Sequence, residues 1–382
     1  MHEHKHNQCK RKVKHRKNVM KLIIFCITVG ISLMFIYYQN LRKEIDARQK
    51  WLETVLTGEK KWILENQGPE GEFYMNGSKA GDVNPYFACM AALGLLAETK
   101  NCPMTETEQK AVGRYLDWHT GVLLETDGKM GIYRKEGGEL IYKEKADSED
   151  GYLGMYLFLM GKYLEKTEST DLPEYWKKGI SLALKKIQSL MQDGITQVSE
   201  ENTTVYLMDN LEVWKGLYEL EHAGLKDVQA IREMRNKLQA QIEKLFWDDA
   251  NQRWRIIENS NLYHQKEFYP DGVAQIYPLI YEFPVKEKKK QKILYKQFTE
   301  RFQWQKLTKK RNGFLWAMTG MAAAQMGDIN NLLEMIRNYE AEYCENRKYP
   351  LYTGEAGWIC MECEKLYSLY ERKIKTGFIL CA

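Results

Sequence analysis

The sequence predicts an all-α protein, an (α/α)6 toroid of six helical hairpins preceded by one N-terminal transmembrane helix. Two observations predict the toroid. After residue 40, a charged amphipathic helix alternates six times with a helix that is apolar nearly all round, and such a helix belongs inside a protein. The apolar helices recur about every 40 to 65 residues, as expected for hairpins joined by loops of variable length. A third observation, a long uncharged N-terminal stretch, predicts the membrane segment.

The N-terminal stretch has the length and the flanks of a membrane anchor. Leu22 to Leu41 carries no charge over twenty residues, and at ~1.5 Å per residue this length spans a ~30 Å hydrocarbon core. Residues 1–21 hold eight lysines and arginines and one acid, so the positive-inside rule places this tail in the cytoplasm and residues 42–382 outside. We therefore expect a single-pass protein of the cell membrane that contacts the bilayer through residues 22–41.

A cleaved signal peptide is the rival interpretation of this stretch. Its apolar core is usually about 7–15 residues long and ends at small residues, whereas Met34 to Asn40 offers no such cleavage site. The uncleaved anchor is therefore favoured. The four histidines of the tail lie among its many cations, which favours a disordered basic segment over a metal site.

Six segments are expected to form the inner layer because they are largely free of charge. The first, Pro85 to Ala97, has no charge and the second, Gly151 to Leu164, has one. Closed into a ring, such helices leave a polar cup where they begin, and we expect the chemistry of the protein there. The other four segments are Leu211–Leu220, Gly272–Tyr281, Gly313–Met326 and Gly357–Leu369.

The helices between these segments carry one apolar stripe each and are expected to form the outer layer. In Lys177 to Gln192, for example, apolar side chains keep helical spacing while four lysines stay on the opposite side. We expect residues 42–382 to fold as one ring-shaped domain. Comparable stripes lie near residues 43–66, 105–120, 231–245, 286–304 and 328–343.

Charge and cysteine usage argue against several classes of protein. The net charge is +4, and because residues 1–21 account for +7, the remaining chain carries −3. The outer domain therefore lacks the basic bias of a nucleic-acid-binding protein.

The eight cysteines do not form a disulfide pattern, and Cys360 and Cys363 form a CxxC without a second pair. Because the first and sixth inner helices are neighbours in a closed ring, a disulfide from Cys89 to Cys360 or Cys363 stays open.

The loops that enter the inner helices are polar and rich in aromatic residues. Helix capping explains any one acid at a helix start, but it does not explain the rings beside these acids. Carboxylates next to flat apolar surfaces suit a sugar, whose hydroxyls need hydrogen bonds and whose C–H faces need apolar contact. The polar residues at four helix starts are Asn84, Asp147 with Asp150, Asp209 with Asn210, and Asp271. The rings expected to bind substrate are Tyr86, Tyr152, Trp214, Tyr269, Trp316 and Trp358.

These loop-and-helix motifs resemble a known family. The segments NPYFACMAALGLL, DSEDGYLGMYL, MDNLEVWKGL and YPDGVAQIYPL, in this order, are similar to six-hairpin (α/α)6 proteins related to glycoside hydrolases, in particular to bacterial membrane-linked or secreted glycosidases. The resemblance covers most of residues 45–370. Members similar to family 8 carry a Glu at the start of the first inner helix and an Asp-rich motif at the second. Asp147 and Asp150 match the second motif, but Asn84 stands where the Glu is expected.

The resemblance implies glycoside hydrolysis by two carboxyl groups, one of which donates a proton while the other activates water. We expect Asp150 to be the base and Asp147 to bind substrate. Because the Glu of the first inner helix is missing, Glu72 is the first choice for the acid and Asp209 the second. Rings of this type usually invert, which predicts carboxyl groups roughly 6.5–9.5 Å apart. The remaining residues expected to bind the sugar are Asn84, Asn210, Asp271 and Glu355.

Two other classes of function remain open, a ring that only binds glycan and a toroid with another chemistry, such as a polysaccharide lyase or an isoprenoid-type cyclase. A ring that binds glycan without cleaving it, within envelope or exopolysaccharide assembly, is favoured by the missing Glu. A polysaccharide lyase needs a Tyr or His base beside a neutralising Arg, and residues 42–382 hold only three histidines. An isoprenoid-type cyclase needs a wholly aromatic pocket, which the polar loops oppose. The sequence favours an enzyme whose partner is an oligo- or polysaccharide, and it indicates no metal, cofactor or protein partner.

Overall fold

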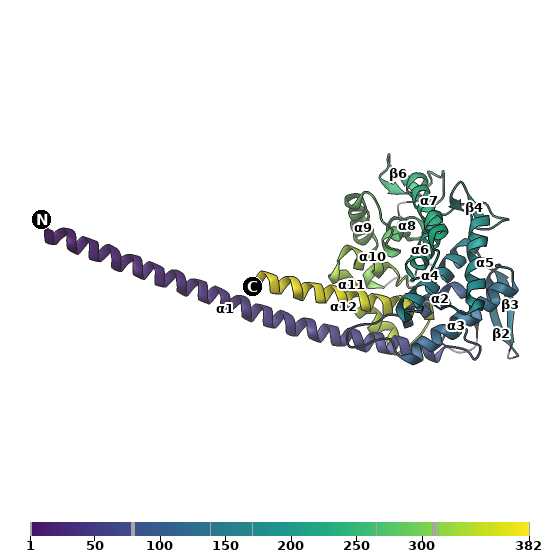
Figure 1. The fold of residues 1–382 in the computed structure, drawn as a ribbon, viewed down its shortest axis with the longest axis horizontal. Coiled ribbons are helices and arrows are strands. Elements are labelled where there is room, and N and C mark those ends of the chain that lie inside the picture. Colours follow the sequence, from purple (N-terminus) through teal and green to yellow (C-terminus); the bar gives the residue numbers. More distant parts are fainter. Residues whose placement is uncertain are drawn as a thin grey trace. The chain divides into compact units, whose positions relative to one another are not determined.

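The computed structural model describes residues 2–77, 81–137, 139–169, 171–264, 266–307, 311 and 313–381. The chain is an all-α (α/α)6 toroid in which outer and inner helices alternate along the sequence, as predicted (Figure 1). The outer helices are α1 (His2–Glu65), α3 (Glu106–Glu125), α5 (Glu174–Leu190), α7 (Gln229–Phe246), α9 (Lys288–Phe302) and α11 (Ile329–Tyr339). The inner helices are α2 (Pro85–Leu95), α4 (Glu149–Thr167), α6 (Leu207–His222), α8 (Val273–Ile280), α10 (Thr319–Met326) and α12 (Thr353–Cys381).

Burial follows the two sequence patterns. In α4 nearly every residue from Glu149 to Gly161 is buried, whereas α7 buries only one stripe, Ile231, Leu238, Ile242 and Phe246. A helix that is apolar on all sides lowers its free energy only when other helices surround it, and a striped helix only when one side is covered. The inner and outer positions are therefore set by the distribution of charge along the sequence.

Glycines let the inner helices approach one another closely. A Cβ atom at Gly154 on α4 would lie 2.7 Å from the backbone nitrogen of Val213 on α6. Where the first and sixth inner helices meet, a Cβ at Gly94 on α2 would lie 2.4 Å from the Cα of Gly357 on α12. Side chains at these positions would force the backbones apart. The contact between α2 and α12 confirms that the first and sixth inner helices are neighbours.

The cysteines near this contact are thiols. Cys89, Cys360 and Cys363 are free and buried. The Sγ atom of Cys89 lies 3.6 Å from the Tyr115 hydroxyl and 3.6 Å from Nδ1 of His119. The disulfide that the sequence left open is therefore not formed.

Short strands lie in the connections between the helices of the ring. The sheet β1–β2–β3 is antiparallel and joins β1 (Asp82–Val83), β2 (Gly131–Glu136) and β3 (Glu139–Lys145), so that a hairpin lies between α3 and α4. Two small ribbons lie beyond it, β4 (Met191–Gln192) with β5 (Ile195–Thr196) and β6 (Trp247–Asp248) with β7 (Arg253–Trp254). Short helical turns occur at η1 (Phe268–Gly272), η2 (Trp304–Lys306) and η3 (Glu340–Cys344). None of these strands was expected from the sequence.

Two expectations about helix bounds were wrong. The fifth inner helix begins at Thr319 rather than at Gly313, because Trp316 has a left-handed backbone conformation (φ +60°) that a right-handed helix cannot contain. The basic tail, which the sequence indicated as disordered, belongs to α1, because this helix begins at His2. Within the described ranges α1 is the one helix long and apolar enough to cross a membrane, by length and composition, and its apolar side chains from Leu22 to Phe35 are mostly exposed.

The chain divides into two compact units. One comprises residues 53–366 and contains the ring. The other comprises residues 1–52 and 367–382, in which the Arg48 guanidinium donates to the Tyr370 hydroxyl at 3.2 Å. The predicted boundaries at residues 21 and 41 stay predictions.

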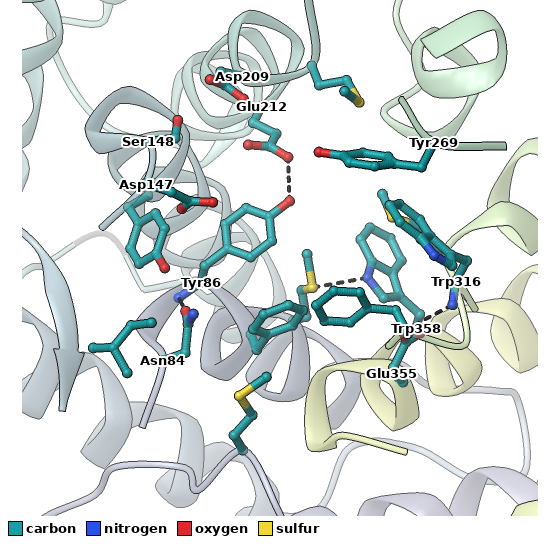
Figure 2. Close-up of a pocket in the computed structure, with 18 of the residues that line it drawn as sticks. Asn84, Tyr86, Asp147, Ser148, Asp209, Glu212, Tyr269, Trp316, Glu355 and Trp358 are labelled. Carbon is teal, nitrogen blue, oxygen red and sulfur yellow. Dashed lines mark hydrogen bonds between the residues drawn. The ribbon is translucent and has the colours of Figure 1, made fainter. Parts of the chain in front are cut away.

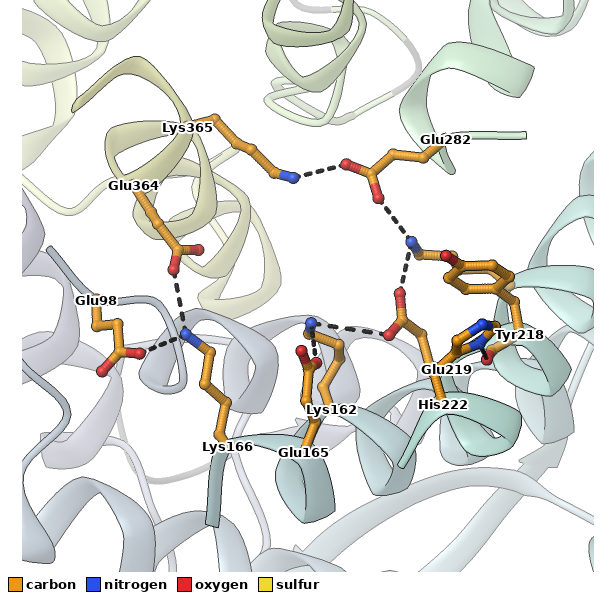
Figure 3. Close-up of polar contacts among 11 residues, drawn as sticks. Glu98, Lys162, Glu165, Lys166, Tyr218, Glu219, His222, Glu282, Glu364 and Lys365 are labelled. Atoms are coloured by element: carbon orange, nitrogen blue, oxygen red, sulfur yellow. Dashed lines mark hydrogen bonds and ion pairs between the residues drawn. The ribbon is translucent and has the colours of Figure 1, made fainter. Parts of the chain in front are cut away.

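Ion pairs connect the inner helices at the ends opposite the cup (Figure 3). Lys215 on α6 contacts Glu219 at 2.7 Å and Glu282, just after α8, at 2.9 Å. Lys365 on α12 contacts the same Glu282 at 2.6 Å. We call this set of pairs the ion-pair ring, and it cross-links α4, α6 and α12 with the residues that follow α2 and α8. Its members are Glu98, Lys162, Glu165, Lys166, Lys215, Glu219, Glu282, Glu364 and Lys365.

The Lys215→Met variant is expected to lower the free energy of unfolding by about 3 kcal/mol at pH 7. Lys215 is only 4% exposed, so its loss leaves Glu219 without its nearest cation and Glu282 with Lys365 as its remaining partner. Urea denaturation of the full chain in detergent measures the change. The matched control is Lys296→Met, because Lys296 forms an exposed pair with Glu300 and such pairs contribute less than about 1 kcal/mol. Equal stability of the two variants would contradict a structural role for the ion-pair ring.

Candidate active site

A cavity of about 580 Å³ opens where the inner helices begin. Residues at or just before the start of every inner helix line it, as the sequence predicted for the cup (Figure 2). The hairpin between α3 and α4 adds a further wall. The residues that line this cup include Asp82, Asn84, Tyr86, Phe87, Glu144, Lys145, Asp147, Ser148, Tyr152, Asp209, Glu212, Tyr269, Tyr277, Phe314, Trp316, Glu355 and Trp358.

Three carboxylates come together on one side of the cup. Asp147 precedes Ser148, the N-cap of α4, and is exposed. Asp209 is the third residue of α6, and Glu212 follows one turn later. Side chains three residues apart on a helix lie on the same face, so Asp209 and Glu212 both reach the cup. Asp209 is half-buried and Glu212 is buried.

Tyrosine hydroxyls surround one oxygen of Glu212. Oε1 accepts a hydrogen bond from Tyr86 on α2, from Tyr277 on α8 at 2.6 Å and from Tyr281, at the end of α8, at 3.3 Å. Burial raises the pKa of Glu212 to about 7 although these donors favour its charged form. The other oxygen, Oε2, lies beside α4, where a Cβ at Gly151 would be 2.7 Å away. The three tyrosine hydroxyls donate to Oε1 and not to Oε2.

The neighbouring aspartates influence one another electrostatically. Burial raises the pKa of Asp209 well above its usual value, and the charges of Asp150 and Glu212 raise it further. The pKa of Asp150 is raised to about 6 by burial. Such a group of carboxyls keeps a proton near neutral pH, because ionising all of its members would place like charges together away from water.

Aromatic side chains form the facing side of the cup. The rings of Tyr269 and Trp316 lie 4.7 Å apart between centroids and meet at 36°. Phe87 stacks on Phe314 at 5.4 Å. Figure 2 shows Tyr269, Trp316 and Trp358 across an open space from Asp147, Asp209 and Glu212. A sugar ring placed between the two sides would meet carboxylates on one side and flat apolar surface on the other.

The structure brings most of the predicted site residues to the cup. Asn84 and Glu355 also have structural roles there. The side-chain oxygen of Asn84 caps α2 by accepting from the backbone N–H of Tyr86 at 2.9 Å, and the carboxylate of Glu355 binds three backbone amides. The predicted residues that line the cup are Asp147, Asp209, Asn84, Tyr86, Tyr152, Tyr269, Trp316, Glu355 and Trp358.

Asp150 and Glu72, which the sequence ranked first as the base and the acid, do not line the cup. Asp150 is 1% exposed, and its oxygens accept from the Ser148 hydroxyl at 2.8 Å and from the Thr196 hydroxyl at 2.7 Å. Glu72 is fully buried and accepts from the Tyr74 hydroxyl at 2.8 Å. It lies beside a separate depression lined by Gln67, Gly68, Pro69, Tyr74, Arg114 and Lys135. Neither carboxylate faces a space where a sugar would meet Asp209 or Glu212.

Three expected sugar-binding residues also lie away from the cup. Asn210 holds β5 on α6 by accepting from the backbone N–H of Thr196 at 2.8 Å and donating to its carbonyl at 2.9 Å. Trp214 stacks on Tyr218 and donates to Gln239 on α7 at 3.3 Å. Asp271 accepts from the backbone N–H of His264 at 2.7 Å. Each of them has a structural partner instead of access to the cavity.

Comparisons with known proteins support the fold. No family model and no curated protein sequence matches the chain. A solved glycosidase, a variant with one glutamate replaced by alanine, matches with a TM-score of 0.61 at 12% identity, covering 85% of this chain and 98% of that one. Another glycosidase, in complex with glucose, matches with a TM-score of 0.56 at 12% identity over 86% and 98%.

An enzyme of stated specificity is among the similar structures. An inactive variant of the alpha-1,6-mannanase GH76A of Salegentibacter sp. HEL1_6, in complex with alpha-1,6-mannotetrose, matches with a TM-score of 0.56 at 9% identity over 83% of this chain and 99% of that chain. At such identities the likeness shows the fold. This chain therefore has the helical toroid fold of these glycosidases.

Proposed function

We propose that the chain is a membrane-anchored glycoside hydrolase that acts on an oligo- or polysaccharide outside the cytoplasm. The observation that carries this proposal is the cup, in which Asp147, Asp209 and Glu212 face the Tyr269–Trp316 pair. Paired carboxylates beside a sugar-sized aromatic surface are the groups that glycoside hydrolysis requires. The activities of the structurally similar glycosidases support the same chemistry.

Within this proposal Asp209 is the general acid and Glu212 the general base. Asp209 keeps its proton because burial and the charges of Asp150 and Glu212 raise its pKa. Glu212 is the charged partner, because three tyrosine hydroxyls donate to its Oε1 and stabilise an anion. Oε2 then takes a proton from water, which attacks the anomeric carbon as Asp209 protonates the leaving oxygen. Asp147 binds substrate hydroxyls. Glu212 thus takes the role of base that the sequence assigned to Asp150, and Asp209 takes the role of acid assigned to Glu72. Asp150 and Glu72 lie outside the cup.

The pH dependence of kcat/KM is expected to have an acid limb near pH 7. Glu212 must lose its proton to act as a base, and its pKa is about 7, so kcat/KM rises as the pH rises through this value. The Tyr277→Phe variant removes a donor that stabilises the anion and should move the limb up by roughly one pH unit. Tyr281→Phe is the matched control, because its longer contact of 3.3 Å predicts a smaller shift. An unchanged limb in Tyr277→Phe would contradict the role of Glu212.

The cavity lining argues against a lyase. Elimination from a uronic acid needs a cation that neutralises the sugar carboxylate, and among the described residues Lys145 is the only basic side chain that lines the cup. Its ammonium group already contacts Glu149 at 3.2 Å and Glu201 at 2.6 Å. A cup with this excess of carboxylates favours a neutral sugar chain over an anionic one.

The enzyme assay uses the full chain in detergent with neutral polysaccharides, including an alpha-1,6-mannan, a β-1,4-glucan and chitin oligomers. New reducing ends are expected with at least one of them, and none with an Asp209→Asn/Glu212→Gln double variant. We propose inversion, so proton NMR of the first product should show the opposite anomer to the substrate. Retention would make Glu212 a nucleophile. Binding without cleavage would favour the non-catalytic glycan-binding ring.

We propose that residues 22–41 of α1 cross the membrane, with residues 1–21 in the cytoplasm and the ring outside. The uncharged length of the segment and the basic residues before it support this orientation. In cells, externally added protease should digest the ring while leaving the tail protected. Release of the ring into the medium without its N-terminal segment would instead indicate a cleaved signal peptide.

A further inference from the structure

The loop before α10 binds a carboxylate from α12 through consecutive backbone amides. The N–H groups of Leu315 and Trp316 donate to Oε1 of Glu355 at 3.2 and 3.1 Å, and the N–H of Ala317 donates to Oε2 at 2.8 Å. Glu355 belongs to the first turn of α12 and is only 5% exposed. One side chain therefore joins the entrances of the fifth and sixth inner helices.

The backbone of this loop has a conformation that requires support. Trp316 has a φ of +60°, in the left-handed region that L-residues other than glycine, asparagine and aspartate seldom adopt. A left-handed residue in a turn directs successive N–H groups toward the same side, and together they form a concave site for an anion. Here the anion is the carboxylate of Glu355. The carboxylate offsets the unfavourable conformation by accepting from three backbone donors at once.

The same loop conformation places the indole of Trp316 at the cup. Its ring contacts Tyr269 at a centroid distance of 4.7 Å and Phe268 at 5.6 Å. Its Nε1 donates to the carbonyl oxygen of Arg311 at 2.8 Å, which fixes the rotation of the ring. Figure 2 shows Trp316 across the open space from Asp209 and Glu212, with Glu355 below it and farther from those acids.

We propose that Glu355 is a positioning residue for sugar binding, whose carboxylate holds residues 315–317 so that Trp316 and Tyr269 present a fixed flat surface to a neutral sugar ring. This inference rests on the proposed function, because it concerns the same cup. Glu355 acts through the loop, and the sugar contacts the indole. A neutral pyranose is the ligand of this surface, because its C–H face packs on an indole while its hydroxyls reach the carboxylates opposite.

The test variant is Glu355→Gln, which keeps the size of the side chain. Its amide oxygen can still accept from Leu315 and Trp316, but its NH2 group opposes the N–H of Ala317, and two donors cannot bond to each other. Glu362→Gln is the matched control. Glu362 lies two turns further along α12, is fully buried and packs against Gly320 on α10 rather than against residues 315–317, so this variant changes a buried carboxyl without removing a hydrogen bond of the loop.

Hydrogen exchange of the full chain without sugar gives the first measurement. The amides of residues 315–317 should exchange about tenfold faster in Glu355→Gln and at the wild-type rate in Glu362→Gln. Equal exchange in the wild type and Glu355→Gln would overturn the proposed loop contact. If Glu355→Gln does not fold, Glu355→Asp replaces it, because the shorter side chain keeps the charge but withdraws the carboxylate from the amides.

Sugar binding gives the second measurement, with mannotetraose, cellotetraose and chitotetraose as probes and indole fluorescence as the signal. Glu355→Gln should raise Kd, and KM where a probe is cleaved, about tenfold while kcat changes less than threefold. In a Trp316→Ala background the same substitution should change Kd less than twofold, because residues that act through one another are not additive. An equal effect in both backgrounds would overturn the proposal.

The outcomes separate this inference from the proposed function. A loss of kcat of a hundredfold or more with unchanged KM would show that Glu355 acts on the scissile bond, and would overturn its positioning role while leaving the enzyme. Coupling between Glu355 and Trp316 in binding, without hydrolysis of any polysaccharide, would support the inference and remove the proposed enzymatic activity. Binding of none of the three probes would overturn the sugar surface.

Discussion

The Glu212→Gln variant is expected to lose about a thousandfold in kcat on the polysaccharide that the enzyme cleaves, with KM changed less than threefold. The amide keeps the volume of the side chain, and its oxygen can still accept from the hydroxyls of Tyr86 and Tyr277. The side chain therefore stays in place, but it can no longer take a proton from water. Initial rates of reducing-end formation measure the loss.

Glu219→Gln is the matched control for this variant. Glu219 lies two turns further along α6, is also buried, and contacts Lys215 at 2.7 Å at the end opposite the cup. Its substitution should lower the thermal midpoint and leave kcat within about twofold, because the ion-pair ring does not contact substrate. A similar loss of kcat in both variants would mean that Glu212 supports the fold of α6 rather than the reaction.

The Asp209→Asn variant is expected to lose roughly a hundred- to a thousandfold in kcat on the polysaccharide and much less on a glycosyl fluoride. An asparagine has no acidic proton to give to the leaving oxygen of a sugar. Fluoride leaves without protonation, so the missing acid matters little for that substrate. Glu212→Gln should be slow on both substrates, because water must be activated in each case. The ratio of the two rates for each variant assigns the roles.

Asp147→Asn is the control for Asp209→Asn, because it removes another carboxylate that lines the cup. Asp147 is exposed and is expected to bind hydroxyls, so KM should rise several-fold with little change in kcat on either substrate. If the glycosyl fluoride restored the rate of Asp147→Asn but not that of Asp209→Asn, Asp147 would be the acid. If Asp209→Asn lost as much kcat on the fluoride as on the polysaccharide, the assignment of Asp209 as the acid would also be contradicted.

The alternation of helices could be predicted from sequence because it depends on local patterns of charge. The uncharged segment that begins at Pro85 and the single stripe of α7 each specify a layer without knowledge of the other helices. Exceptions arise where distant contacts decide the structure. The late start of α10 depends on Glu355, almost forty residues away in sequence. The β2–β3 hairpin has its signal in a Gly137 turn, which a search for helical spacing does not detect.

The candidate site could be predicted only in part, because helix starts identify capping acids as readily as catalytic ones. Asp150 and Asp209 both lie in the first turn of an inner helix, but the Asp150 carboxylate accepts a hydrogen bond from Thr196 in the interior, whereas Asp209 lines the cup. Glu212 was missed because it lies one turn inside α6. Its position three residues after Asp209 was the available signal. Its environment comes from tyrosines on α2 and α8, which only the closed ring brings together.

The central claim is that the cup binds a sugar chain with its scissile bond beside Asp209 and Glu212. A crystal structure of the full-length Glu212→Gln variant with an uncleaved oligosaccharide of its substrate tests it most directly. The account predicts a glycosidic oxygen within about 3 Å of the Asp209 carboxyl, a water molecule at the side chain of residue 212, and a sugar ring against Trp316. A sugar bound elsewhere on the chain, or one in the cup with its glycosidic bonds remote from Asp209, would contradict the account.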